Sequence, residues 1–123
     1  MPVERADEHP SFELGGNKVT SFAAPSRGGD EAALFRIDLP PGGAVPRHQH
    51  DHLDVFAVQR GDVRVQIGDA ETEVFEGDSV VIPSGEWHMF VAGDAGASLL
   101  VTMLGGTKMI REDGSIVVPP WVS

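Results

Sequence analysis

The sequence contains no cysteine and no tyrosine, and its basic residues are few. Without cysteine the chain has no disulfide framework, no thiolate nucleophile and no cysteine-ligated zinc or iron–sulfur cluster, so any metal must bind to nitrogen and oxygen. The absence of tyrosine removes acid–base chemistry by a phenol group. Nine basic residues stand against 19 acidic ones, a formal net charge of −10, which argues against nucleic acid and membrane surfaces as partners.

Long apolar runs are also missing. No stretch approaches the ~18 residues of a membrane span, and the N-terminus lacks the pattern of a signal peptide, so we expect a cytoplasmic protein. The 123 residues, 41% of them hydrophobic and 23% charged, fit one globular domain with one core. We expect residues 1–10 to form a flexible N-terminal arm and residues 11–123 to form the domain.

Fifteen glycines and nine prolines divide the chain into apolar segments that are short for helices but typical of β-strands. The expected strands cover residues 12–14, 18–23, 32–39, 54–59, 62–67, 71–75, 79–82, 88–92, 98–104, 109–111 and 116–118. Many short strands separated by turns predict an all-β sandwich or barrel. The proline-rich tail, residues 118–121, is expected to pack onto the surface or across a partner.

Three of the five histidines lie close together, at positions 48, 50 and 52, and Asp54 continues the same spacing. Alternate residues of an extended strand point to one side, so these four side chains would share one face. Polar groups crowded in this way need partners, and one metal ion satisfies all of them. Imidazole and carboxylate ligands suit a first-row divalent ion. His88 is the remaining histidine beyond the arm and the candidate ligand from a second strand.

Two glycine-bounded patterns resemble the paired motifs of the cupin superfamily. The first has the spacing G-x5-H-x-H-x3-D-x6-G over residues 42–61, and the second has G-x5-P-x-G-x2-H over residues 77–88. The fifteen residues between them match the short spacing of compact bacterial cupins. The resemblance implies an all-β, cupin-type double-stranded β-helix, or jelly-roll barrel. It also implies one divalent transition metal ion (Fe, Mn, Ni, Co, Cu or Zn) bound by His48, His50, Asp54 and His88.

Two positions depart from the family pattern. Asp54 stands where the family usually has glutamate, and Ala92 stands where the second motif ends in asparagine. Because aspartate is one methylene shorter, two ligand sets stay open. Either Asp54 binds the ion directly, or three histidines bind it and Asp54 orients one of them or a metal-bound water.

Four other side chains have candidate roles beside the metal. His52 is a catalytic candidate as a proton shuttle, with a solvated side chain as the alternative. Glu86 is a candidate general base beside His88, against a more ordinary solvated role. Arg36 and Arg64 lie on expected strands and are candidates to pair with a substrate anion, although exposed strand arginines are more common.

The alternation of side chains also predicts an interior and an outer face. Phe56, Val58, Phe90 and Ala92 should point inward and leave little room, so the substrate should be a small molecule. Trp87, Met89 and Val91 would then form an apolar outer face, which in small cupins commonly packs against a second subunit. We therefore expect a homodimer; the alternative is that the chain's own termini cover this face.

The resemblance supports three functions. The first is a metal-dependent dioxygenase or related oxidoreductase that binds a small organic substrate and O2 at the metal. The second is a non-redox lyase, isomerase or polyketide cyclase that uses the same ion to polarise a carbonyl or hydroxyl group. The third is a small-molecule or metal-binding cupin without turnover. Fold resemblance alone does not choose among them.

Overall fold

The structure is a computed structural model that describes residues 3–123. Within these residues the chain forms ten strands, two short 3-10 turns and no α-helix, which confirms the all-β prediction. None of the described segments is a helix long and apolar enough to cross a membrane. The 3-10 turns are η1 (Ala6–Glu8) and η2 (Pro25–Arg27), and the strands are β1 (Ser11–Leu14), β2 (Asn17–Ala23), β3 (Ala32–Leu39), β4 (Ala44–His50), β5 (Asp54–Ile67), β6 (Ala70–Phe75), β7 (Ser79–Ile82), β8 (His88–Leu104), β9 (Met109–Arg111) and β10 (Ile116–Val117).

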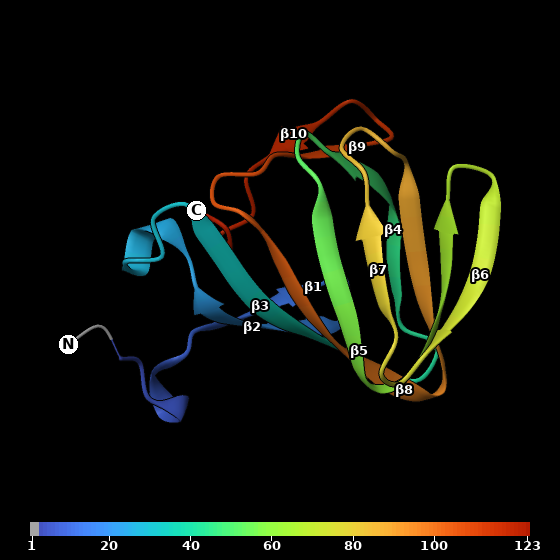
Figure 1. The fold of residues 1–123 in the computed structure, drawn as a ribbon, viewed down its shortest axis with the longest axis horizontal. Helices are drawn as coiled ribbons and strands as arrows, with labels where there is room; N and C mark the ends of the chain where they lie inside the picture. The colour runs from blue at the N-terminus through green and yellow to red at the C-terminus, as the bar shows by residue number, and fades with distance from the viewer. Residues whose placement is uncertain (1–2) are drawn as a thin grey trace.

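All ten strands belong to one curved sheet. Its main path runs β1-β2-β3-β8-β4-β9-β10, and β5 joins it by pairing with β8, β6 and β7. In Figure 1 the strands β4, β5, β7 and β8 stand side by side, and β9 and β10 lie across the upper end of the molecule. The sheet therefore curls around one interior, and Pro119 and Trp121 from the last part of the chain are among the residues that line its cavity.

The two longest strands, β5 and β8, differ from the expected pairs of short strands. The expected strands left breaks at residues 60–61 and 93–97, where Gly61 and Gly93 were interpreted as turn residues, but each glycine lies inside a continuous strand. The β5–β8 register shifts near Gly61 instead of ending there. A glycine inside a strand permits such a bulge and a local bend. The first half of each long strand thus lies on a different part of the barrel from the second half.

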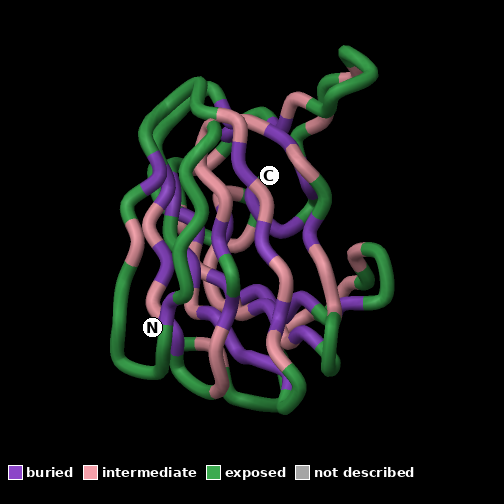
Figure 2. The backbone as a smooth tube through the Cα atoms, turned by 90° about the vertical axis from the view of Figure 1, so that its right-hand side faces the viewer, coloured by how far each residue is buried: buried purple, intermediate pink, exposed green. Residues whose placement is uncertain are grey.

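The interior matches the predicted alternation. Phe56, Val58, Phe90 and Ala92 are all buried, and the tube in Figure 2 shows buried residues alternating with more exposed ones along the strands. Each large apolar side chain that is fully buried contributes roughly 1.5–3 kcal/mol through removal of its surface from water. The core is therefore continuous with the face of the sheet that carries the histidines.

The two ends of the chain pack against the barrel. Trp121 is buried against Phe12 and Phe35, with ring centroids 5.9 and 6.3 Å away. The tail thus packs onto its own domain, one of the two expected arrangements. Before β1, Glu4 forms an ion pair with Arg27 at 3.3 Å. The flexibility of residues 1–10 stays a prediction, and residues 1 and 2 lie outside the described part.

Candidate metal centre

Two neighbouring strands bring three histidines together. His48 and His50 are two residues apart on β4, so both point into the barrel. His48 lies directly opposite His88 in the antiparallel pairing of β4 with β8. The rings of His48 and His88 are 4.2 Å apart between centroids, and those of His48 and His50 are 4.8 Å apart. The three histidines therefore form one buried cluster.

The cluster has the geometry of a metal-binding group. One candidate ligand atom from each of the three imidazoles lies within 4.8 Å of the other two. The Nδ1–H of His48 donates to the carbonyl oxygen of Pro46 at 2.7 Å, and that of His88 donates to Glu86 at 2.8 Å. Backbone acceptors of this kind fix the tautomer and leave Nε2 as the free ligand atom. In both rings the lone pair on Nε2 is thus available.

The unsatisfied polar atoms of the site support this interpretation. His88 Nε2 and His50 Nδ1 are buried without a hydrogen-bond partner among the described residues. A buried polar atom without a partner costs about 1–3 kcal/mol, so native proteins seldom leave one unused. A divalent ion bound to the lone pairs of three imidazoles would give His88 Nε2 a partner, and the residues present therefore fit a transition metal.

Burial keeps these imidazoles neutral, which is the form that binds metal. Desolvation lowers the pKa of His50 to about 3, helped by its neighbours His48 and His88. Desolvation likewise lowers the pKa of His88 to about 4. The pKa of His48 is lowered for the same reason, and the Arg111 guanidinium adds to the effect. At neutral pH all three rings carry free lone pairs.

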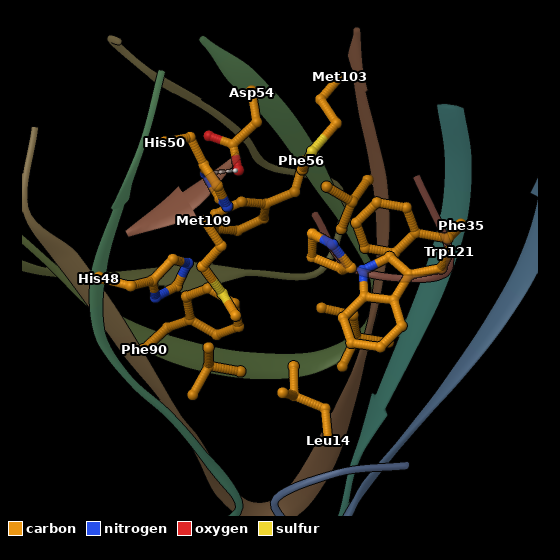
Figure 3. A pocket seen from close by; sticks show the side chains of 14 residues that line it. Leu14, Phe35, His48, His50, Asp54, Phe56, Phe90, Met103, Met109 and Trp121 are labelled. Carbon is orange, nitrogen blue, oxygen red and sulfur yellow. Dashed lines mark ion pairs between the residues drawn. The ribbon is translucent and has the colours of Figure 1, made fainter. Parts of the chain in front are cut away.

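Asp54 lies beside the cluster and outside the group of three nitrogens. It is the first residue of β5, and its Oδ2 is 3.5 Å from His50 Nδ1, the contact dashed in Figure 3. Oδ1 is buried without a hydrogen-bond partner. Burial raises the pKa of this carboxyl to about 7. Of the two expected ligand sets, this position favours the one in which Asp54 acts through His50, while direct coordination stays a prediction.

The other two candidate residues, His52 and Glu86, do not line the cavity. Strand β4 ends at His50, and the bend that follows turns His52 away from the shared face, contrary to strict alternation. Its side chain is 46% exposed and lies 3.0 Å from the Asp51 carboxylate. The Glu86 side chain is exposed, and this residue contacts the cluster only through its carbonyl oxygen. Their catalytic roles stay predictions.

A narrow apolar cavity adjoins the histidines. Its volume is about 30 Å³, room for only about two water molecules. Figure 3 shows the imidazoles of His48 and His50 with Asp54 on one side and Trp121 with Phe35 on the other; His88 does not line this cavity. The 14 lining residues are Leu14, Phe35, Ile37, Val45, His48, His50, Asp54, Phe56, Phe90, Val101, Met103, Met109, Pro119 and Trp121.

Several lining residues were missed from the sequence. Met109 lies opposite His50 in the pairing of β4 with β9 and therefore shares its face. The alternation within one strand gives no sign of which strand pairs with it, so neither Met109 nor Trp121 was identified. The two arginines that were considered lie elsewhere: Arg36 pairs with Asp38 at 3.0 Å, and Arg64 pairs with Glu71 at 3.1 Å.

Comparisons with known proteins agree with this arrangement. A family model described as "Cupin domain" matches residues 35–103, more than half of the chain. No curated protein matches the sequence. Among solved structures, an RmlC-like cupin from Shewanella frigidimarina aligns with a TM-score of 0.72 at 22% identity, covering 89% of this chain and 92% of that protein.

Two structures of named enzymes align as well. The polyketide cyclase RemF from Streptomyces resistomycificus has a TM-score of 0.73 at 24% identity, covering 85% of this chain and 79% of the cyclase. A variant of oxalate decarboxylase from Bacillus subtilis has a TM-score of 0.71 at 23% identity, covering 78% of this chain and 27% of that enzyme. Likenesses at this level of identity show the fold, and the predicted barrel type is confirmed.

Proposed function

This chain belongs to the cupin family, and from that premise we propose that it is a metal-dependent enzyme that acts on a small organic molecule. One divalent transition metal ion would be held by His48, His50 and His88. The observation that carries the proposal is the convergence of these three buried imidazoles, which offer candidate ligand atoms within 4.8 Å of one another. Surface histidines of no functional importance would have no reason to converge in this way.

Different residues of the chain would have different roles at such a metal centre. When bound, a first-row ion on three imidazoles supplies Lewis acidity and open positions for substrate oxygen atoms. The carbonyl oxygens of Pro46 and Glu86 hold the His48 and His88 rings in orientation. The carboxyl group of Asp54, with its pKa near 7, can hold or release a proton beside His50. The apolar walls exclude bulk water.

The finer proposal is a dioxygenase or related oxidoreductase. The lining of the narrow cavity is mostly apolar apart from His48, His50 and Asp54. An apolar space of this size suits a small uncharged molecule such as O2. The substrate would then bind at the same centre through its own oxygen atoms. Substrates with an enol or an aromatic hydroxyl group are the class to examine.

A specific observation favours a second candidate, a non-redox lyase, isomerase or cyclase. Asp54 is a buried carboxyl group whose pKa lies near neutral pH, which is the property expected of a proton-transferring residue. Two enzymes that share the fold bear the names polyketide cyclase and oxalate decarboxylase. In this version no oxidant is consumed.

Oxygen uptake separates the two versions. Protein loaded in turn with Fe(II), Mn(II), Ni(II) or Zn(II) would be supplied with enolic and aromatic substrates in an oxygen electrode, with product analysis by mass spectrometry. We expect uptake with a redox-active ion and none under Zn(II). Turnover that continues without O2 and with Zn(II) would identify the non-redox enzyme.

The controls for this assay are two histidine variants. His48→Ala should abolish turnover, whereas His9→Ala, in a histidine that packs on Phe22 and does not line the cavity, should leave turnover above half of its original rate. Protein that binds one metal ion per chain and turns over nothing in either atmosphere would contradict the enzyme proposal. It would then favour a small-molecule or metal-binding protein.

A further inference from the structure

A second cavity adjoins the candidate metal centre from outside. It is a groove of about 330 Å³ whose walls come from the β1–β2 hairpin, β4 and β9. The groove shares four lining residues with the inner cavity: Leu14, Val45, His48 and Met109. Because His48 lines both spaces, a molecule in the groove would lie against one of the three candidate ligands.

Hydrogen bonds fix the position of the β1–β2 hairpin, which forms one wall of this groove. The side-chain amide of Asn17, which is buried, donates to the carbonyl oxygens of Leu14 and Ala44, each at 2.9 Å. One bond stays within the hairpin and the other ties it to the start of β4. The apolar side of the groove, which includes Leu14, is therefore a fixed feature of the fold.

Arg111 supplies a positive charge to the same groove. It lies directly opposite His48 in the antiparallel pairing of β4 with β9. Residues paired in this way have side chains on the same face of the sheet, so Arg111 leans toward the side that carries the histidines. Its side chain lines the groove together with His48. A molecule bound in the groove would thus lie against both residues.

The guanidinium of Arg111 has no acidic partner among residues 3–123. Its single hydrogen bond, to Ser115 Oγ, is long at 3.4 Å. By contrast, Arg47, which also lines the groove, pairs with Glu112 at 3.8 Å. The lowered pKa of the exposed Asp113 stems mainly from its hydrogen bonds with Ser115 and includes a contribution from Arg111, but no carboxylate among the described residues forms an ion pair with this arginine. Its guanidinium is therefore available to a ligand in the groove.

We propose that the groove binds a small organic carboxylate as substrate, with its carboxylate on Arg111 and its apolar part over Leu14, Val45 and Met109. This inference rests on the proposed function, for which it names the substrate class. A guanidinium matches a carboxylate with two parallel hydrogen bonds, and the apolar walls match a hydrocarbon body. The groove has only one arginine without an ion-pair partner, and the carboxylates of Glu112 and Asp113 line it as well; this charge balance disfavours polyanions such as nucleic acid.

The test compares two molecules of the same shape that differ in charge. Benzoate and its neutral analogue benzamide would be titrated into the full chain, both zinc-loaded and metal-free, and followed by two-dimensional NMR. In both forms we expect benzoate to bind ~5-fold or more tightly than benzamide, the scale of one partly exposed charged pair. The metal-free form matters because there a preference cannot arise from carboxylate binding to the ion.

Three variants assign the preference to one side chain. Arg111→Gln should remove it, and Arg111→Lys, which keeps the charge, should retain part of it. Arg60→Gln is the matched control, because Arg60 is also exposed and bonds only to the carbonyl oxygen of Ala95, away from the groove. The NMR spectrum of each variant reports whether it is folded.

The outcomes for the groove and for the metal centre are separate. Equal binding of benzoate and benzamide by the wild-type protein, or a preference that Arg111→Gln leaves unchanged, would overturn the carboxylate site even if the protein binds metal. A wild-type protein that prefers benzoate through Arg111 but binds no metal at His48, His50 and His88 would support the site and overturn the proposed function.

Discussion

The buried carboxyl group of Asp54 has a different role in each of the two ligand sets. In one set it binds the metal directly, and in the other it acts through His50. Asp54 contacts His50 at 3.5 Å and is not part of the three-nitrogen group. We expect Asp54→Asn to retain more than half of the bound metal, because the three imidazoles remain. We also expect it to lower turnover by at least ~10-fold, because an amide cannot transfer the proton.

Elemental analysis of the Asp54→Asn protein, together with its turnover, measures both effects. Loss of most of the metal would instead place Asp54 among the direct ligands. The sequence motif alone predicted which carboxylate belongs to the site. It did not predict how that carboxylate is used, because the reach of an aspartate depends on the exact position of the strand that carries it.

The buried histidines also make the stability of the metal-free protein depend on pH. His50 and His88 have lowered pKa values, about 3 and about 4, so at pH 5 they are neutral when folded and protonated when unfolded. Their contribution is present above pH 6.5 and is lost as the pH falls. Asp54, with its pKa raised to about 7, contributes in the opposite sense, since its share is lost as the pH rises.

The unfolded chain therefore binds two more protons on these histidines at pH 5 and one fewer on Asp54. We expect the free energy of unfolding of metal-free protein to fall by about 1 to 2 kcal/mol per pH unit between pH 6.5 and 5, the larger value including His48, whose pKa is also lowered by burial. Urea denaturation in the presence of a chelator measures this. A free energy of unfolding that stays constant or increases over that range would show that the imidazoles are not buried as described.

At the level of elements, the bend in β5 positions the two halves of the barrel. Gly61 has φ of +76°, and a Cβ there would collide with the carbonyl oxygen of Gly96 on β8. Gly77 also has a positive φ, of +91°, but a Cβ there would meet no atom within 4 Å. Position 61 thus needs glycine for both backbone conformation and space.

We expect Gly61→Ala to lower the free energy of unfolding by more than ~3 kcal/mol, against about 1 kcal/mol for Gly77→Ala. Chemical denaturation of the two variants beside the wild type measures the difference. Equal effects would mean that the close contact between β5 and β8 is absent.

This element also shows why only part of the fold could be predicted. The two motifs specify the spacing of ligands and turns, so the barrel type was predicted correctly. The alternation of side chains correctly predicted that Phe56 and Phe90 point inward. Gly61 was interpreted as part of a turn because a glycine beside charged residues is typical both of turns and of β-bulges. The pairing of β9 with β4, which places Met109 and Arg111 at the site, leaves no signal within either strand.

At the scale of the whole molecule, the outer surface of the barrel carries exposed apolar side chains. Leu53, Val81 and Leu104 are 50–60% exposed, and Val81 lies opposite Val55 in the pairing of β7 with β5. Trp87, which was expected on this kind of surface, is half-buried, with the Arg47 guanidinium 5.8 Å from its ring centroid.

The homodimer was predicted from an outer face of Trp87, Met89 and Val91, and all three are half-buried. The exposed side chains of Leu53, Val81 and Leu104 support the same proposal, since exposed apolar patches commonly mark subunit contacts. Light scattering across a dilution series should give twice the mass of one chain. We expect Val81→Glu to shift the protein toward monomer and Ile116→Glu, at an equally exposed position on β10, to leave it dimeric. A wild-type protein that is monomeric at every concentration would refute the prediction.

Metal content of the purified chain tests the central claim most directly. Protein prepared without an affinity tag, and then exposed to Fe(II), Mn(II) or Zn(II) and washed, should carry about one ion per chain in elemental analysis. His48→Ala and His88→Ala should each lower that content at least ~10-fold, and His52→Ala, outside the cluster, should not change it. The same metal content in all four proteins, or none in the wild type, would contradict a metal centre at the converging histidines.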